Sequence, residues 1–380
     1  MPRKFLILFV LTIGLYSCGT PPTTVPTPIM SPPTVESQAV RTLPSPIPSA
    51  TAPQSANPIL TPTHSPGLTP TLPRVTPTAL PLNPLQIAYL RKRSYPGSAI
   101  TIEQTLAPGA NYNQYIASYQ SDGLKIYALL TVPRGPKPPT GWPVIIFNHG
   151  YIPPHIYQTT QRYVAYVDAL ARAGYIVFKS DYRGHGRSQG SADGGGYWSP
   201  DFTIDVLNAL SSLQKFPEAD PHRIGMWGHS MGGMVTLRAA VVSKAIKAEV
   251  IWSGVVGTYE DLMYNWHQTD PTDYVPTAAS QQLHETLIKD HGTPRQDAQF
   301  WASVSPSTYI GDLSGPLQLH HDLADGEVPV EFSQELYAKA KQAGKIAELY
   351  TYPGDDHNLT HSFSLAMQRT IAFFDQYVKR

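Results

Sequence analysis

The sequence has a single cysteine, Cys18, among 380 residues. A disulfide needs two cysteines, so the folded part of the chain has no internal disulfide. An excess of charge of either sign is also absent, because 28 lysines and arginines face 28 aspartates and glutamates. Proteins that bind nucleic acids usually carry a basic excess, so the balance argues against a nucleic-acid partner.

The N-terminus has only a short apolar run, too short for a comfortable membrane span. Residues 5–15 are apolar and follow Arg3 and Lys4, but a span needs about 20 residues. This pattern predicts a secretory signal. It ends in "LYSC", which resembles the lipobox of bacterial lipoproteins. The resemblance implies a signal peptide over residues 1–18, a lipidated Cys18 and an extracytoplasmic, membrane-anchored protein. An uncleaved signal anchor and a secreted form are the alternatives.

Proline, by contrast, is abundant, and many of the 38 prolines fall in residues 19–85. Stretches such as "TPPTTVPTPIMSPPTV" lack the apolar periodicity that a hydrophobic core requires. Proline favours an extended, polyproline-like chain. We therefore expect residues 19–85 to be a tether, with a globular domain over residues 86–380.

The globular part begins with "SYQSDGLKIYALLTVP", whose alternation around "SDG" predicts an antiparallel hairpin. Apolar strands then alternate with helical segments, which predicts a mainly parallel central sheet with helices on both faces. Residues 255–312 break this pattern and are rich in tyrosine, tryptophan, histidine and proline, as expected of a lid or cap. The predicted strands are 143–150, 175–181, 223–229, 248–254, 316–321 and 347–353, and the predicted helices are 161–174, 202–216, 231–243 and 362–379.

Ser230 is the central residue of a G-x-S-x-G motif that lies between a predicted strand and a predicted helix. This setting is typical of a nucleophile elbow, a sharp turn that holds the serine in a strained conformation. The small neighbours Gly228 and Gly232 avoid clashes there, and the helix N-terminus directs N–H groups at developing negative charge. The alternative is an ordinary strand-to-helix turn with an incidental serine.

A nucleophilic serine needs a histidine base and an acid that orients it, and in this arrangement both follow the serine in the chain. Asp325 lies in "LHHDLADGEVP", on the loop after one predicted strand. His357 lies in "YTYPGDDHNL", on the loop after the last predicted strand. Both loops leave the same edge of a parallel sheet as the elbow does. We therefore predict a Ser230–Asp325–His357 triad.

Other carboxylates near these positions compete for the role of acid. Asp322 is nearer to the strand end than Asp325, and Glu327 is an alternative acid. Asp355 and Asp356 directly precede His357 and are expected to shape its turn.

The chain has 13 histidines, so histidines other than His357 are also candidates for the base. We expect His361 to start the last helix, and His229 to face away from the site by strand alternation. His320 and His321 are interpreted as packed strand residues. A metal site of these two with Asp322 is disfavoured, because adjacent strand residues point to opposite faces. No metal or cofactor is expected.

An oxyanion hole requires two hydrogen-bond donors. The backbone N–H of Met231, directly after the nucleophile, is the first predicted donor. The second should come from "FNHGYIPP", where the backbone or hydroxyl of Tyr151 is the candidate. The alternative is that Tyr151 packs against the lid.

From about residue 115 to residue 380, these motifs resemble an α/β-hydrolase, and most of all the catalytic domain of the prolyl oligopeptidase family of serine peptidases. The motifs are "SYQSDGLKIYALLTVP", "PVIIFNHGY", "DYRGHGRSQG", "GHSMGGM", "LHHDLADGEVP" and "YPGDDHNL". The resemblance implies the same triad, and it implies that the Tyr151 hydroxyl donates to the oxyanion. It also implies that Arg183 braces the site, with His185 in a structural role.

Two departures from the family pattern bear on function. Family peptidases often carry a β-propeller, for which this sequence has no room, and Asp322 stands where the acid loop usually has glycine. Related domains without a propeller include many esterases. We expect a serine hydrolase that forms an acyl-enzyme and acts on short peptides. The alternatives are a carboxylesterase, an acyl transferase and a non-catalytic binding protein on a hydrolase scaffold.

Overall fold

The computed structural model describes residues 81–269 and 276–380. The predicted signal peptide, Cys18 and nearly all of the predicted tether lie outside these residues. None of the described helices combines the length and apolar character that a membrane crossing requires. The described part is built on one nine-stranded sheet with the order β1-β2-β3-β5-β4-β6-β7-β8-β9.

The first strands of the sheet are antiparallel, and they include the predicted hairpin. Asp122 and Gly123 both have positive φ angles, 53° and 78°, which matches the two-residue turn that follows the twist of a hairpin. Ser121 and Leu124 close the register on either side of this turn. The strands are β1 (Thr101–Thr105), β2 (Tyr112–Ser121) and β3 (Leu124–Pro133).

The remaining strands run parallel to one another, so the predicted mainly parallel sheet is confirmed. β3 joins the two parts through antiparallel pairing with β5. The parallel strands are β4 (Trp142–Asn148), β5 (Ile176–Ser180), β6 (Ala219–His229), β7 (Glu249–Trp252), β8 (Leu317–Asp322) and β9 (Ala347–Tyr352).

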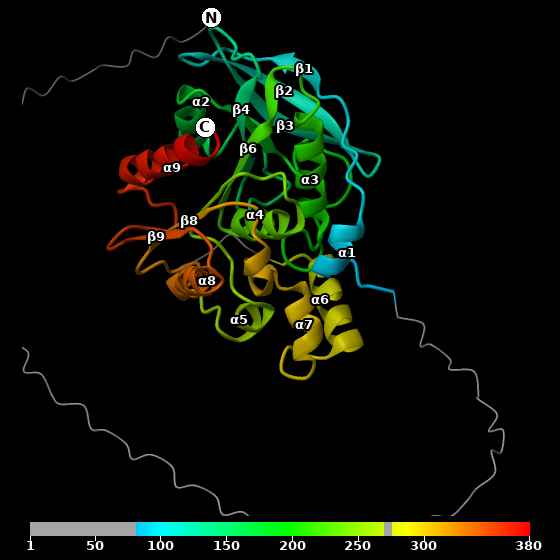
Figure 1. The fold of residues 1–380 in the computed structure, drawn as a ribbon. Coiled ribbons are helices and arrows are strands. Elements are labelled where there is room, and N and C mark those ends of the chain that lie inside the picture. The colour runs from blue at the N-terminus through cyan, green and yellow to red at the C-terminus, as the bar shows by residue number, and fades with distance from the viewer. Residues whose placement is uncertain (1–80, 270–275) are drawn as a thin grey trace, which may run out of the picture. The chain divides into compact units, whose positions relative to one another are not determined.

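Helices cover both faces of the sheet, as predicted (Figure 1). Alternation along β4 explains the two layers: Val144 and Ile146 belong to one buried cluster, while Ile145 and Phe147 belong to the other. The first face carries α1 (Ile87–Lys92), α3 (Asp201–Leu213), α4 (Met231–Val242) and α8 (Val330–Gln342), and the second carries α2 (Val164–Arg172) and α9 (Phe363–Tyr377). Helix α8 was not predicted.

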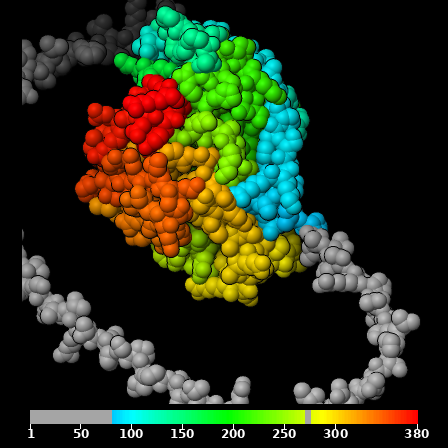
Figure 2. Space-filling model, in the orientation of Figure 1, coloured from blue at the N-terminus to red at the C-terminus, as the bar shows by residue number. Residues whose placement is uncertain are grey.

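The segment predicted as a lid folds into helices that share a small apolar cluster with Leu85, the last residue of the predicted tether. Tyr259, Leu287, Phe300 and Trp301 form this cluster. Helices α6 and α7, in yellow, gather at one end of the described domain (Figure 2). The elements are α5 (Tyr259–Tyr264), α6 (Ala278–His291), α7 (Ala298–Val304) and the 3₁₀ helix η1 (Pro306–Asp312), while residues 270–275 lie outside the described part.

Arg183, which follows β5, ties three parts of the domain together. Its Nη2 lies 2.7 Å from Oδ1 of the fully buried Asp205 on α3. Its Nη1 lies 3.2 Å from Asp201, also on α3, and Nη2 lies 3.4 Å from Asp122 in the hairpin turn. The guanidinium therefore links the hairpin, the loop after β5 and α3.

Replacing Arg183 by methionine should destabilise the domain, because it leaves the Asp205 carboxylate buried without its partner. Losing one member of a buried ion pair costs about 3–5 kcal/mol of unfolding free energy. Urea denaturation would measure this loss. Arg172→Met, which removes an exposed pair with Asp168, is the control and should change stability by less than about 1 kcal/mol. Equal effects of the two variants would contradict this account of Arg183.

Candidate active site

Ser230 lies on a tight turn between β6 and α4, at the edge of the sheet where the parallel strands end. Its φ and ψ angles are 55° and −122°, in the left-handed half of the map that side chains other than glycine rarely occupy. Hydrogen bonds hold this conformation. The Ser230 amide donates to the Trp252 carbonyl at 3.1 Å, and its carbonyl accepts from the Gly233 amide at 2.9 Å.

Two glycines make this turn possible. A Cβ added at Gly232 would lie 2.0 Å from the Asn148 carbonyl oxygen at the end of β4. A Cβ added at Gly228 would lie 2.3 Å from Thr236 Oγ1 on α4. The start of α4 therefore packs so closely against β4 and β6 that neither position has room for a side chain.

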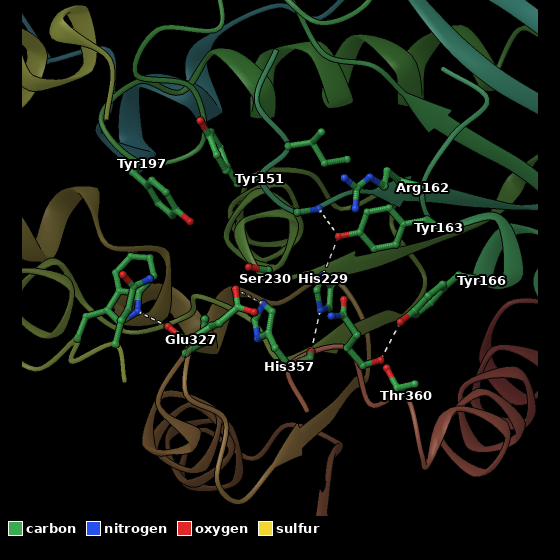
Figure 3. A pocket seen from close by; sticks show the side chains of 16 residues that line it. Tyr151, Arg162, Tyr163, Tyr166, Tyr197, His229, Ser230, Glu327, His357 and Thr360 are labelled. Carbon is green, nitrogen blue, oxygen red and sulfur yellow. Dashed lines mark hydrogen bonds and ion pairs between the residues drawn. The ribbon is translucent and has the colours of Figure 1, made fainter. Parts of the chain in front are cut away.

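The serine opens into a pocket of about 530 Å³ (Figure 3). Ser230 and His357 line it, with charged side chains contributed by Arg162 and Glu327. The segment predicted as a lid contributes Trp266 and Gln268. The other aromatic residues of the wall are Tyr151, Tyr163, Tyr166 and Tyr197.

The structure brings the predicted acid and base together at this pocket. His357 Nδ1 lies 2.8 Å from Asp325 Oδ2. Because a carboxylate accepts, Nδ1 donates, which leaves Nε2 as the nitrogen able to receive a proton. Glu327, the alternative acid, approaches Nε2 instead, with 4.0 Å between its Oε2 and that nitrogen. The geometry therefore favours Asp325 over Glu327 as the orienting acid.

The Asp325 carboxylate is fully buried and held on several sides. Its Oδ1 accepts from the backbone amides of Glu327 and Val328 at 2.9 and 3.0 Å, and His321 Nε2 lies 3.2 Å from Oδ2. Burial raises the pKa of Asp325, but hydrogen bonds from His321 and His357 outweigh it and hold the pKa far below its usual range. The Asp325 carboxylate is thus ionised at neutral pH.

The competing acids have other partners. Asp322 accepts from the Ala324 amide at 2.9 Å and from the Asp355 amide at 3.0 Å, so it ties the acid loop to the base loop. Asp355 and Asp356 shape the turn around His357, as interpreted from the sequence. Their carboxylates accept hydrogen bonds from the backbone amides of Asn358, Thr360, His361 and Ser362.

Neighbouring histidines on β8 point to opposite faces of the sheet. His320 Nδ1 lies 2.7 Å from the Tyr352 hydroxyl, whereas His321 Nδ1 lies 2.7 Å from Ser333 Oγ on α8. Both are buried in the strand, as interpreted from the sequence. His321 has a further contact that the sequence did not indicate, because it touches the acid Asp325.

His229 does not turn away from the site as predicted. It lines the pocket, its Nε2 lies 3.0 Å from the His357 carbonyl oxygen, and the two rings are 4.6 Å apart. Strand alternation places His229 on the same face as Trp227, whose ring is parallel to it. The error arose because the base loop, which begins at the end of β9, reaches this face.

Tyr163 is a site residue that the sequence analysis missed. Its hydroxyl lies 3.0 Å from the Gly150 amide and 2.8 Å from His229 Nδ1. These partners are 13 and 66 residues away, so no local pattern marks the tyrosine. Since the Gly150 amide is engaged, Tyr151 is the next residue of that loop able to supply an oxyanion donor.

Both predicted oxyanion residues lie close to Ser230. Met231 is the first residue of α4, and the first amides of a helix have no acceptor within it. Tyr151 lines the pocket above Ser230 (Figure 3). Their placement agrees with the predicted role, which itself stays a prediction.

Comparison with known proteins finds a matching family profile and several similar proteins. The sequence profile of the prolyl oligopeptidase family matches residues 161–380. The uncharacterized peptidase YuxL of Bacillus subtilis (strain 168) is 29% identical over 254 residues, which are 63% of this chain and 35% of that protein. The chain therefore spans about a third of the length of this relative.

Solved structures share the fold. An acylaminoacyl peptidase in complex with Z-Gly-Gly-Phe-chloromethyl ketone matches with a TM-score of 0.56 and 24% identity, over 71% of this chain and 42% of that one. The acetyl xylan esterase from Paenibacillus sp. R4 matches with a TM-score of 0.57 and 18% identity, over 77% of this chain and 92% of that one. Both likenesses establish the α/β-hydrolase fold.

Two isosteric substitutions separate the candidate acids. Asp325→Asn should lower kcat by roughly 10⁴-fold, because an amide cannot hold the same His357 tautomer or stabilise its cation. Glu327→Gln should cost far less, since Glu327 does not contact Nδ1. Steady-state hydrolysis of a chromogenic ester measures both. A larger loss in Glu327→Gln than in Asp325→Asn would assign the acid to Glu327.

Proposed function

The chain belongs to the prolyl oligopeptidase family, and from this we propose that it is a serine hydrolase that works through an acyl-enzyme on short peptides. One observation carries the proposal. Ser230, on a strained elbow, and His357, paired with a buried Asp325, line the same pocket. The profile match to a peptidase family supports peptides as the substrate class.

In the proposed reaction, Ser230 Oγ attacks the acyl carbon while His357 Nε2 accepts its proton. Asp325 holds Nδ1–H and stabilises the imidazolium. The imidazolium then gives the proton to the leaving amine, and the C–N bond breaks. His357 then deprotonates a water molecule, whose oxygen attacks the acyl carbon. The ester bond to Ser230 breaks, His357 returns the proton to Ser230 Oγ, and the acyl group leaves as a carboxylic acid.

The tetrahedral intermediate carries negative charge on its oxygen. In the proposal, the Met231 amide and Tyr151 donate hydrogen bonds to this oxyanion. A single such donor is worth roughly 2.7–4 kcal/mol of transition-state stabilisation. The chemistry assigned to these side chains requires no metal or cofactor.

Carboxylic esters are the alternative substrates. The same triad and oxyanion hole would cleave an ester, whose leaving group departs more easily than an amine. The fold match to an acetyl xylan esterase extends over 92% of that enzyme, against 42% of the acylaminoacyl peptidase chain. This likeness of fold keeps the ester alternative open, and an experiment has to separate the two.

The deciding measurement compares kcat/KM of the full-length protein on an aminoacyl ester and on the amide with the same acyl group. The peptidase proposal predicts amide cleavage that Ser230→Ala abolishes, because the nucleophile is lost. Ester cleavage without amide cleavage would assign an esterase. The hydrolase proposal would fail if the Ser230→Ala variant kept its turnover. It would also fail if the wild-type protein bound the substrates without cleaving them.

We further propose that a lipid on Cys18 anchors the domain outside the cytoplasm. The support is the signal-like N-terminus ending in "LYSC" and the Pro/Thr/Ser-rich stretch that follows it. Such a tether would hold the pocket clear of the membrane or cell wall.

Metabolic labelling with an alkyne-bearing fatty acid tests the anchor. The wild-type protein should be labelled and Cys18→Ser should not, because Cys18 is the only thiol that could carry the lipid. An unlabelled wild-type protein in the membrane fraction would indicate an uncleaved signal anchor, and one in the medium would indicate secretion.

A further inference from the structure

A line of hydrogen bonds crosses the floor of the pocket and connects residues that are distant in the sequence (Figure 3). The Gly150 amide lies 3.0 Å from the Tyr163 hydroxyl, which lies 2.8 Å from His229 Nδ1. His229 Nε2 in turn lies 3.0 Å from the His357 carbonyl oxygen. Tyr163 and His229 take part in no step of the proposed reaction.

Elementary chemistry fixes the direction of each of these bonds. The His357 carbonyl can only accept, so His229 Nε2 donates to it, and in a neutral imidazole Nδ1 must then accept. The Tyr163 hydroxyl therefore donates to Nδ1, and its oxygen accepts from Gly150. Burial lowers the pKa of His229 to about 3, so the ring is neutral at pH 7.

The line touches each part of the proposed machinery. Gly150 directly precedes Tyr151, the predicted oxyanion donor, and His229 directly precedes Ser230. The line of hydrogen bonds ends at the backbone carbonyl of His357. A shift of either loop relative to the nucleophile would therefore stretch at least one of these bonds.

Tyr163 is built into the fold rather than resting on the surface. Arg162 and Tyr163 both adopt positive φ angles, 56° and 54°, a strained conformation that the surroundings must maintain. The buried Lys179 helps, because its ammonium donates to the Gln161 carbonyl at 2.9 Å. The Tyr163 ring also packs edge-on against Phe147 of β4.

We propose that His229 and Tyr163 are positioning residues that fix the spacing of the oxyanion loop and the base loop across Ser230. The inference rests on the proposed function, since it assigns these residues to the same reaction. They act through Tyr151 and His357 and take part in no proton transfer or bond change of the proposed reaction.

Substitutions in the full-length protein test each half of the line. Tyr163→Phe removes the link between Gly150 and His229, and His229→Ala removes both of His229's bonds. His229→Asn retains an acceptor near the Nδ1 position, while His229→Gln retains a donor near the Nε2 position.

Tyr163→Phe and His229→Ala should lower kcat by about 10- to 100-fold with KM within a few-fold, because small displacements of reacting groups cost this much. The Asn and Gln variants should fall between these and the wild type.

A second readout separates positioning from general loosening of the fold. A substrate-like trifluoromethyl ketone forms a tetrahedral adduct whose oxygen occupies the oxyanion hole. Its affinity should fall in Tyr163→Phe by about the same factor as kcat. Tyr175→Phe is the matched control, since it removes one hydroxyl bond of a buried tyrosine, to Asp375, away from the pocket. The control should lose as much thermal stability as Tyr163→Phe, yet keep kcat and inhibitor affinity.

The results can overturn the inference without touching the proposed function. Unchanged kcat and inhibitor affinity in Tyr163→Phe would overturn it, provided that Ser230→Ala remains inactive. If Tyr163→Phe did not fold, the His229 pair would decide: Asn and Gln variants as active as the wild type would overturn the inference. If turnover survived in Ser230→Ala, the proposed function itself would be wrong, whatever Tyr163→Phe showed.

Discussion

Ser230 is held in a left-handed backbone conformation between β6 and α4, and the other parts of the site are arranged around that turn. The turn exists because Gly232 lets the first turn of α4 approach the Asn148 carbonyl at the end of β4. Parallel strands on either side of β6 then deliver their loops to the same edge. A side chain at Gly232 would push the helix away and displace Ser230 from the rest of the site.

Buried charge is the second feature that the site has to accommodate. Asp325 is buried but remains ionised, because two histidines and two backbone amides surround its oxygens. Asp322 performs a different task on the same loop, where it joins the acid loop to the base loop through the Asp355 amide. The departure from glycine at this position therefore adds a brace between the loops and leaves the Asp325–His357 pair in place.

Much of the fold follows from local patterns in the sequence. The hairpin around Asp122–Gly123 and the alternation of apolar strands with amphipathic helices are short-range signals, and the structure contains them. Helix α8 was missed because its buried positions, among them Ser333 and Ala340, include small or polar residues that form only a weak apolar stripe. The predicted signal peptide rests on the charge and apolar pattern that ends in "LYSC", and the predicted tether rests on composition.

By itself, the sequence determined the G-x-S-x-G motif at Ser230, the chain order of the predicted acid and base, and the edge of the sheet where their loops lie, because chain order and strand alternation are local properties. Only the tertiary structure decided which side chains contact these residues and hold them in place. His229 was wrongly predicted to face away from the site, because its contacts depend on where a loop 128 residues away passes. Tyr163 carries no signal of its own, since its partners, Gly150 and His229, become neighbours only when β4, β6 and α2 pack together.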